Sequence, residues 1–468
     1  MSLEDLRAPL AGLGDGVWIV GGCLRDALLG RPVADVDLAV RGDAAAMART
    51  FARSRGAGRF PLSAEFGAWR ILGGDLPYTV DITPLQGGDL AEDLSRRDLS
   101  VNAMALPVTG PAELVDPHGG RADTAARVLR AVGPAAFTAD PVRVLRAARI
   151  ADQTGFALDP ATVRLAREAA PTLWGSSPER LRDELFRMAQ SPTAWRALEL
   201  LDDLGGLGVL VPQLEAARGM EQNDYHHKDV LGHTLEVVEH ACRLAADPGP
   251  VFRGDAPRLA ALLAEPLADG LTRGQGLVVA ALLHDMAKPE TRAVQPGGRV
   301  TFFHHDRIGA AEAEDLLTRL RAANRLRAQV AALVRDHLRL GFMVHRQPVS
   351  VRQADRYLRA TEPAATEQIV LSVADRLATD GPRTTPIQIT RHLDLARQVL
   401  RIHLGLLDRG PIRPPLPGDR LAAAVGVGPG PWLSEVIEEL RERQLTREVT
   451  PDAAVRFARE WLAMRGDL

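Results

Sequence analysis

Short apolar runs alternate with polar turns along the first part of the chain, and this pattern predicts a unit that mixes strands with helices. Val17–Val20 is an apolar run of strand length, and two glycines end it before a helix begins. Asp35 and Asp37 alternate around an apolar residue, so on a strand both carboxylates face the same side. We expect the apolar run that contains Asp81 to form a strand beside this acidic pair.

A helical spacing of apolar residues takes over after Pro141, as Val144 and Ala148 show. Two stretches rich in glycine and proline, residues 248–257 and 410–417, read as loops or linkers. The pattern predicts an α+β protein: a small β-sheet head followed by a mostly α-helical neck, a further helical domain and a helical tail. We place these four parts at residues 1–125, 126–215, 216–385 and 386–468.

Composition adds only a few constraints. The 468 residues carry a net charge of −3, so any contact with a nucleic acid must come from local basic patches. The two cysteines, Cys23 and Cys242, give neither a disulfide framework nor a zinc-site spacing. No apolar run approaches the roughly 18 residues of a membrane span, and the N-terminus lacks a signal-peptide pattern. We therefore expect a soluble, cytoplasmic protein with no membrane partner.

The first chemical signal combines a glycine turn with an acidic pair. Glycines permit close backbone approach, and the N–H groups of the helix that follows could hold a triphosphate. Two carboxylates about 7 Å apart along a strand suit one or two Mg²⁺ ions. In this order the two features predict Mg²⁺-dependent in-line attack on a nucleoside triphosphate. The residues concerned are Gly21, Gly22, Arg25, Asp26, Asp35 and Asp37.

A second signal is a cluster of acids, arginines and an asparagine at residues 93–103. Arginine forks match phosphate oxygens, and Asp or Asn side chains can bind ribose hydroxyls. Further on, Asp140 and Arg143 stand three residues apart on a predicted helix and so share a face. Such a pair can satisfy the Watson–Crick edge of a base, although a plain surface ion pair has the same spacing. The candidate nucleotide-binding residues here are Arg96, Arg97, Asp98, Asn102, Asp140, Arg143 and Arg146.

Together with residues 139–149 and 177–185, these elements resemble the bacterial class II tRNA nucleotidyltransferases, the CCA-adding and poly(A) polymerase family. The resemblance is strong over about residues 10–210. It implies a nucleotidyltransferase head of the polymerase β type that extends tRNA 3′ ends from CTP and ATP without a template, releasing pyrophosphate. It also implies that Asp35 and Asp37 are catalytic and hold Mg²⁺.

In the resembling enzymes, the residues that match Asp140 and Arg143 select C and A. Many relatives have Glu before that Asp, whereas this chain has Ala139. CCA-adding relatives also carry a longer flexible segment before the arginine cluster, and here only residues 82–92 separate Asp81 from Asp93. A short segment resembles the CC-adding branch, which needs a separate A-adding enzyme. We expect CC addition, with full CCA addition, A addition and poly(A) synthesis as alternatives.

The middle of the chain carries a separate set of imidazoles and carboxylates in helical contexts, which suits a divalent transition metal such as Mn, Ni, Co or Fe. Their order resembles that of the HD-domain phosphohydrolases, and His305 and His337 fall where some members hold a second metal. An alternative function is therefore a phosphatase or 2′,3′-cyclic phosphodiesterase with a tRNA-binding N-terminal half. A degenerate, structural HD domain also stays open. The expected ligands are His233, His284, Asp285 and Asp375.

A basic segment at residues 319–359 contains ten arginines and only two acids. Such a segment could bind the tRNA backbone electrostatically. Solvated helix faces in a chain so rich in arginine have the same composition, and both interpretations stay open.

Overall fold

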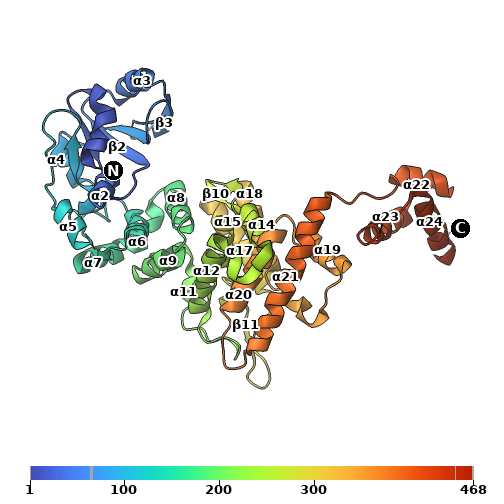
Figure 1. Ribbon diagram of the computed structural model, residues 1–468. Coiled ribbons are helices and arrows are strands. Elements are labelled where there is room, and N and C mark those ends of the chain that lie inside the picture. The colour runs from blue at the N-terminus through green and yellow to red at the C-terminus, as the bar shows by residue number, and fades with distance from the viewer. Residues whose placement is uncertain (1, 64–66, 448, 466–468) are drawn as a thin grey trace. The chain divides into compact units, whose positions relative to one another are not determined.

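The computed structural model describes residues 2–63, 67–447 and 449–465 (Figure 1). It divides into two compact units, Met1–Glu215 and Ala216–Leu468, and each is described by itself. The mixture of a β-sheet head with helical parts confirms the predicted α+β class.

The first unit contains a six-stranded sheet in the order β3-β4-β5-β2-β1-β6. β2 runs parallel to β5, and their register sets Asp37 opposite Asp81, which confirms the predicted neighbour strand. The other pairings within this sheet are antiparallel. The strands are β1 (Val17–Val20), β2 (Asp35–Val40), β3 (Gly58–Ser63), β4 (Ala68–Leu72), β5 (Thr79–Pro84) and β6 (Ala105–Pro107).

The two faces of this sheet have different neighbours. One face carries the main core of the head, where Val36 of β2 and Phe51 of α3 (Ala44–Ser54) belong to one buried cluster. A smaller cluster joins Ala39 of β2 to Leu94 of α4 (Leu90–Ser95). Because side chains alternate along a strand, the acidic pair projects from the same face as Ala39. The arginine cluster that follows α4 is thus brought to the face that carries the two carboxylates.

The rest of the first unit is helical apart from the short parallel pair β7 (Val128–Leu129) and β8 (Ala157–Leu158). Val144 and Ala148 are fully buried, as their helical spacing predicted. The helices are α1 (Leu3–Arg7), α2 (Gly22–Leu28), α5 (Gly120–Ala126), α6 (Arg143–Thr154), α7 (Pro160–Ala169), α8 (Pro178–Ala189), α9 (Ala194–Asp203), α10 (Gly206–Leu210) and α11 (Pro212–Ala216), with 3-10 turns η1 (Ala8–Leu13), η2 (Ser100–Asn102) and η3 (Ala170–Gly175).

The second unit is built from helices and two short hairpins, β9/β10 (Pro266–Ala268, Leu271–Thr272) and β11/β12 (Arg292–Val294, Val300–Phe302). The reading of residues 248–257 as a linker is wrong, because α13 (Gly249–Phe252), a 3-10 turn at Arg253–Asp255 and the start of α14 (Ala256–Leu263) occupy them. The other helices before the tail are α12 (Val230–Ala246), α15 (Arg273–Leu283), α16 (Lys288–Thr291), α17 (His305–Arg319), α18 (Asn324–Asp336), α19 (Val351–Ala360), α20 (Ala365–Leu377) and α21 (Pro386–Arg409), with a 3-10 turn at Gly341–Arg346.

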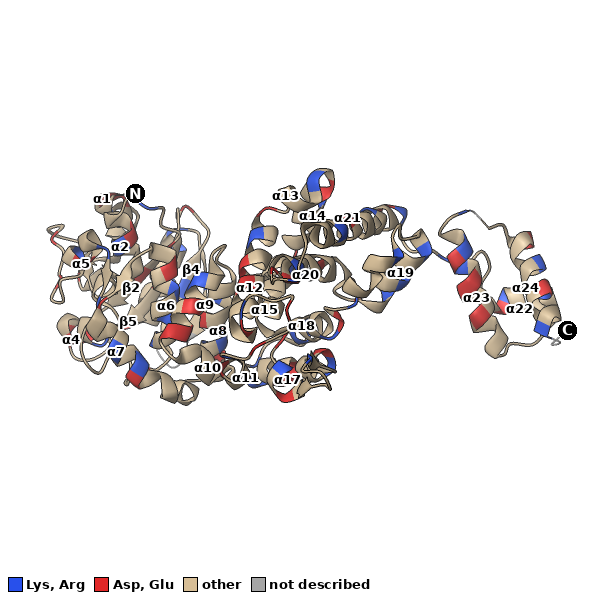
Figure 2. Ribbon diagram, turned by 90° about the horizontal axis from the view of Figure 1, so that it is seen from below, with Lys and Arg blue, Asp and Glu red and all other residues tan. Residues whose placement is uncertain are grey.

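Residues 410–417 contain no helix or strand, as their composition predicted, and three helices follow them. These are α22 (Gly418–Val425), α23 (Pro431–Gln444) and α24 (Pro451–Arg465), and they share a core of their own that includes Leu421, Val436 and Leu462. The acidic positions of α23 are coloured red on the ribbon of Figure 2. Within the described residues, no helix is long and apolar enough to cross a membrane.

Candidate functional site

The glycine turn and the acidic pair meet in the first unit. Gly21 has φ +85° and caps α2, a conformation that L side chains rarely adopt. A Cβ atom at this position would lie 3.0 Å from Oδ2 of Asp37. Both the backbone angle and this close approach therefore require glycine. The turn brings main-chain atoms directly against one of the two carboxylates, as phosphate binding beside a metal site requires.

Three carboxylates crowd this edge of the sheet. Asp81 is buried, and Nε and Nη2 of Arg70 donate to its two oxygens at 2.8 and 2.6 Å. Asp37 is open to the cavity, yet the protein around it and the charge of Asp81 raise the pKa of its carboxyl to about 6. Asp35 lies two residues before Asp37 on β2 and is exposed. Two hard oxygen ligands with an excess of negative charge fit a divalent cation such as Mg²⁺.

A cavity of about 510 Å³ opens beside Asp37, and seven of its lining residues are arginines. Three acids, Asp37, Asp93 and Asp98, also line it, so the arginine charges predominate. This balance fits a triphosphate, because guanidinium groups bind phosphate oxygens with two parallel hydrogen bonds. Of the predicted residues, the cavity is lined by Gly21, Gly22, Arg25, Asp37, Arg96, Arg97, Asp98, Asn102, Arg143 and Arg146, whereas Asp26, Asp35 and Asp140 are not part of its lining.

Hydrogen bonds fix the predicted arginine at the start of α2. Arg25 donates to both oxygens of Asp26, at 3.0 and 2.8 Å, and to Oδ1 of Asn102 at 2.9 Å. Asn102 in turn donates to Oδ1 of Asp98 at 3.2 Å. Asp26 therefore acts behind the cavity wall by holding Arg25, and the motif at residues 21–26 is linked to the cluster at residues 93–103.

A buried carboxylate that our sequence assignment left out organises the other side of the cavity. Oε1 of Glu184 accepts from Nε of Arg146 at 3.1 Å, and Oε2 accepts from Nε of Arg149 at 2.7 Å. Arg187 donates to Oε1 at 3.4 Å. Burial opposes ionisation of Glu184, but the charges of Arg146 and Arg149 prevail and lower its pKa. The spacing of Arg143, Arg146 and Arg149 along α6 was a signal in the sequence for the third member.

A second cavity of about 610 Å³ shares Gln86, Arg96 and Arg143 with the first and is otherwise lined by Asp140, Arg180 and small residues. The predicted Asp140–Arg143 pair is looser than its spacing suggests, because Nε of Arg143 lies 3.4 Å from Oδ2 of Asp140. Arg180 instead binds both oxygens of Asp140, at 3.0 and 2.6 Å. Arg143 donates to the backbone carbonyl oxygens of Arg96, Arg97 and Ala136. Sequence spacing did not reveal Arg180 as the main partner.

The short segment between β5 and α4 is tied down by hydrogen bonds. The backbone N–H of Gln86 donates to Oδ1 of Asp93 at 2.9 Å, and that of Gly88 donates to Oε2 of Glu92 at 2.7 Å. Asp93 also accepts from Arg97 at 3.0 Å. The segment is thus closed onto the start of the arginine cluster.

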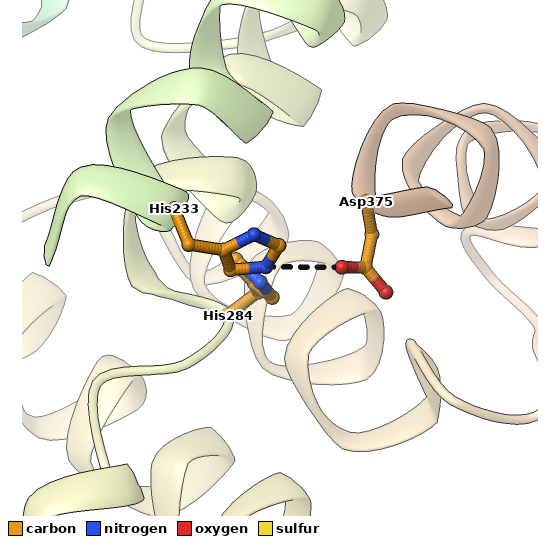
Figure 3. A group of neighbouring side chains, drawn as sticks. All are labelled: His233, His284 and Asp375. Carbon is orange, nitrogen blue, oxygen red and sulfur yellow. Dashed lines mark ion pairs between the residues drawn. The ribbon is translucent and has the colours of Figure 1, made fainter. Parts of the chain in front are cut away.

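The second unit brings four buried imidazoles together, three of them at helix ends or starts. In each ring Nδ1 faces a backbone carbonyl oxygen, which holds the ring and leaves Nε2 as the free ligand atom. Figure 3 shows His233, His284 and Asp375 converging from three helical segments. The carbonyl partners are Ala378 for His233 (3.3 Å), Ala281 for His284 (2.8 Å), Phe302 for His305 (2.6 Å) and Val334 for His337 (2.7 Å).

The ligand atoms fall into two groups, and within each they lie within 4.8 Å of one another. One group is His233, His284 and Asp375, and the other is Asp285, His305 and His337. Asp285 lies between them: Oδ2 is 3.0 Å from Nε2 of His284, and Oδ1 is 3.3 Å from Nε2 of His305. Sequence order had placed Asp285 with the first group alone.

Unsatisfied atoms indicate that this centre fits a metal. Nε2 of His233, Nε2 of His284 and both oxygens of Asp285 are buried and make no hydrogen bond of good geometry, although Asp285 lies within ion-pair distance of His284, His305 and Lys288. Burial lowers the pKa of His337 to about 4, and the nearby charge of His284 adds to this effect, so His337 is a neutral imidazole near pH 7. Neutral imidazoles with carboxylates are ligands for divalent transition metals. Lys288, whose Nζ is 2.6 Å from Oδ2 of Asp285, already offsets part of the negative charge.

Several arginines of the basic segment at residues 319–359 pair with acidic residues inside the second unit. Asp336 accepts from Arg335 at 2.9 Å and from Arg339 at 2.8 Å. Arg356 binds both oxygens of Glu442 at 2.6 and 2.8 Å. These pairs offset the charge of several arginines that could otherwise face RNA phosphates.

Comparison with known proteins gives the class. Residues 17–85 and 74–130 match the poly(A) polymerase head domain, residues 155–218 match the probable RNA- and SrmB-binding site of polymerase A, and residues 230–380 match the HD domain. The fold and the arginine cavity thus belong to a nucleotidyltransferase with an appended HD domain.

Whole-chain relatives give the family. The chain is 36% identical to an A-adding tRNA nucleotidyltransferase of Deinococcus radiodurans, over 97% of this chain and 98% of the relative. It is 34% identical to a CC-adding tRNA nucleotidyltransferase of Geobacter sulfurreducens, over 96% and 94%. A solved structure of the Thermotoga maritima CCA-adding enzyme with tRNA shares the fold, with a TM-score of 0.61 and 19% identity over 98% and 95%. The chain belongs to the tRNA nucleotidyltransferase family and is an enzyme of that type.

Proposed function

We propose that the first unit transfers nucleotides from CTP or ATP to the 3′ end of tRNA, with Asp35 and Asp37 as the catalytic carboxylates. The observation that carries this assignment is the cavity of seven arginines that opens directly beside Asp37 and Gly21. Mg²⁺ held by the two carboxylates would supply activation of the 3′-hydroxyl and stabilisation of the leaving pyrophosphate. A protein that acts on tRNA in this way would work in the cytoplasm.

The cavity residues have separable roles in this proposal. The triphosphate would be bound by Arg25, Arg97 and Arg146, because these arginines line the cavity beside Asp37. Asp140 and Arg143 would face the base from the second cavity, with Arg180 holding Asp140. Asp98 and Asn102 would reach the ribose.

For the added nucleotides, we propose CC addition, followed in the cell by a separate A-adding enzyme. The support is the short segment before α4, which two backbone hydrogen bonds hold closed. A closed segment has little freedom to re-form the base site after the second C. Addition of A alone is the second candidate, favoured by the 36% identity to an A-adding relative.

The test is incorporation of labelled CTP and ATP, separately and together, into three tRNA transcripts that end at the discriminator base, after one C and after two. Two C additions without A support the proposal. Addition of A after the second C with CTP use means CCA addition, and A addition without CTP use means the A-adding candidate. The Asp35→Asn and Asp37→Asn variants should incorporate nothing.

We propose a four-part division of the chain: nucleotidyltransferase head 1–125, neck 126–215, HD domain 216–385 and tail 386–468. For the HD domain we propose metal-dependent hydrolysis of phosphomonoesters or 2′,3′-cyclic phosphates. This second function is supported by four imidazoles that present Nε2 to one buried centre. The His284→Ala variant should lose bound transition metal and hydrolysis while nucleotide addition persists.

A further inference from the structure

A cavity of about 320 Å³ lies against the imidazole centre of the second unit. Its lining includes Asp375 from one ligand group and His337 from the other. A molecule in this cavity would therefore contact both groups at once. The volume lies near the lower end of the range for small-molecule sites.

One cavity residue carries a positive charge without a partner. Arg376 follows Asp375 in the last turn of α20, and its Nε is buried with no hydrogen bond. Among the described residues, its guanidinium makes no hydrogen bond or ion pair. This sets it apart from Arg335, Arg339 and Arg356, which all have acidic partners. A buried guanidinium atom without a partner calls for an anion that binds there.

Another part of the cavity lining is held in place by a glycine contact. Tyr225 lines the cavity, and its carbonyl oxygen accepts from the N–H of Gly381 at 2.8 Å and from Oγ1 of Thr384 at 3.1 Å. A Cβ atom at position 381 would lie 2.4 Å from the carbonyl carbon of Tyr225, so only glycine permits this approach. The segment after α20 thus fixes the position of Tyr225, which lines the same cavity as Arg376.

We infer that Arg376 is the phosphate anchor of the HD site: its guanidinium binds the phosphoryl group of the substrate beside the metal centre. This assignment rests on the proposed hydrolase function and adds the group that selects an anionic substrate. Arg376 would contact the substrate directly and hold its phosphoryl oxygens, whereas a metal held by the histidines and aspartates would supply the activation of water. Replacing it should weaken phosphate binding more than turnover.

The test uses the full-length Arg376→Gln and Arg376→Lys variants, with Arg391→Gln as a control that removes one exposed arginine from the neighbouring helix α21. Calorimetry measures binding of inorganic phosphate to metal-free and Mn²⁺-loaded protein, and metal content is measured separately. Hydrolysis of para-nitrophenyl phosphate gives KM and kcat. We expect Arg376→Gln to raise both the phosphate Kd and KM by about 10- to 100-fold, with kcat nearly unchanged. Arg376→Lys should recover part of the loss, and Arg391→Gln should match the wild type.

The possible outcomes distinguish the proposed role of Arg376 in phosphate binding from the proposed hydrolase function of the HD domain. Unchanged Kd and KM in Arg376→Gln would overturn the anchor even if the wild type hydrolyses the ester. Loss of bound metal in that variant would overturn it too, because the arginine would then support the ligands. A wild type that binds phosphate through Arg376 but hydrolyses neither phosphomonoesters nor cyclic phosphates would overturn the hydrolase and leave the anchor supported.

Discussion

Replacing Glu184 with glutamine should weaken the first unit and the nucleotide site together. The carboxylate is buried, and it accepts two hydrogen bonds from arginine Nε atoms within 3.1 Å, from Arg146 and Arg149. Each charge-assisted bond of this kind contributes about 1.5–3 kcal/mol. An amide keeps one acceptor but removes the negative charge, which leaves Arg149 without its carboxylate partner and Arg146 with only Asp98 at 3.6 Å. We therefore expect a loss of about 3–5 kcal/mol in the free energy of unfolding.

The same substitution should also impair nucleotide binding, because the arginines held by Glu184 line the cavity. Loss of their orientation should lower kcat/KM for CTP by about 100-fold. Urea unfolding, monitored by hydrogen exchange of peptides from α6 and α8, measures the stability of this unit. Single-nucleotide incorporation measures kcat/KM. Glu168→Gln, an exposed change in α7, is the matched control. Wild-type unfolding and wild-type kcat/KM in Glu184→Gln would refute the reasoning.

The loss of stability in Glu184→Gln should depend on pH, and the lowered pKa of Glu184 gives the direction of this dependence. The pKa of Glu184 is lowered in the folded state, so its contribution to stability is present above the unfolded value of about 4.3 and is lost as the pH falls through the folded value. The stability difference between the wild type and Glu184→Gln should therefore be full at pH 7 and should shrink under acid conditions. A difference that stays constant down to pH 3 would contradict the ionic origin of the effect.

Three further predictions concern the same unit. The pKa of Asp37 is raised to about 6, so its protonated carboxyl contributes to the stability of the metal-free fold below the unfolded pKa of about 3.9, and this contribution is lost as the pH rises through 6. Protons therefore compete with Mg²⁺ for this carboxylate at low pH. Titrations of activity with Mg²⁺ should show that more Mg²⁺ is needed below pH 6. Arg180→Gln should release Asp140 and reduce discrimination against UTP and GTP by about tenfold, measured as the ratio of kcat/KM values, and an unchanged ratio would contradict its positioning role. Gly21→Ala should cost about 1–3 kcal/mol through its φ of +85° and abolish most incorporation, whereas thermal unfolding and activity like those of the wild type would show that the turn tolerates a side chain.

Local patterns predicted the parts of this protein that local geometry determines. β1, the glycine turn after it and the alternation of Asp35 and Asp37 follow from strand period and from the backbone freedom of glycine. The neighbouring strand was predicted from its apolar run around Asp81, and the structure adds that it pairs with β2 in parallel.

The missed features depend on contacts between residues far apart in the sequence. Glu184 lies in α8, some 35 or more residues from the arginines of α6 that it binds, and no periodicity joins them. Arg180 meets Asp140 across a similar separation. The position of Asp285 between two ligand groups required His305 and His337 to be placed by tertiary packing. The helical turns in residues 248–257 formed because proline is tolerated in the first turn of a helix.

The contacts of Asp140 suggest how a missing side chain can be compensated. Arg180 binds both oxygens of Asp140, next to Ala139, where the family resemblance led us to expect a glutamate. Arg143 is held by three backbone carbonyl oxygens in place of a second carboxylate. Backbone carbonyls are fixed by the fold, so they position a guanidinium without the rotamer freedom of a glutamate side chain. The orientation of Arg143, the arginine proposed to read the base, is therefore set by the chain path around residues 96–97 and 136. A glutamate added at position 139 should compete with Asp140 for Arg180 and disturb this arrangement.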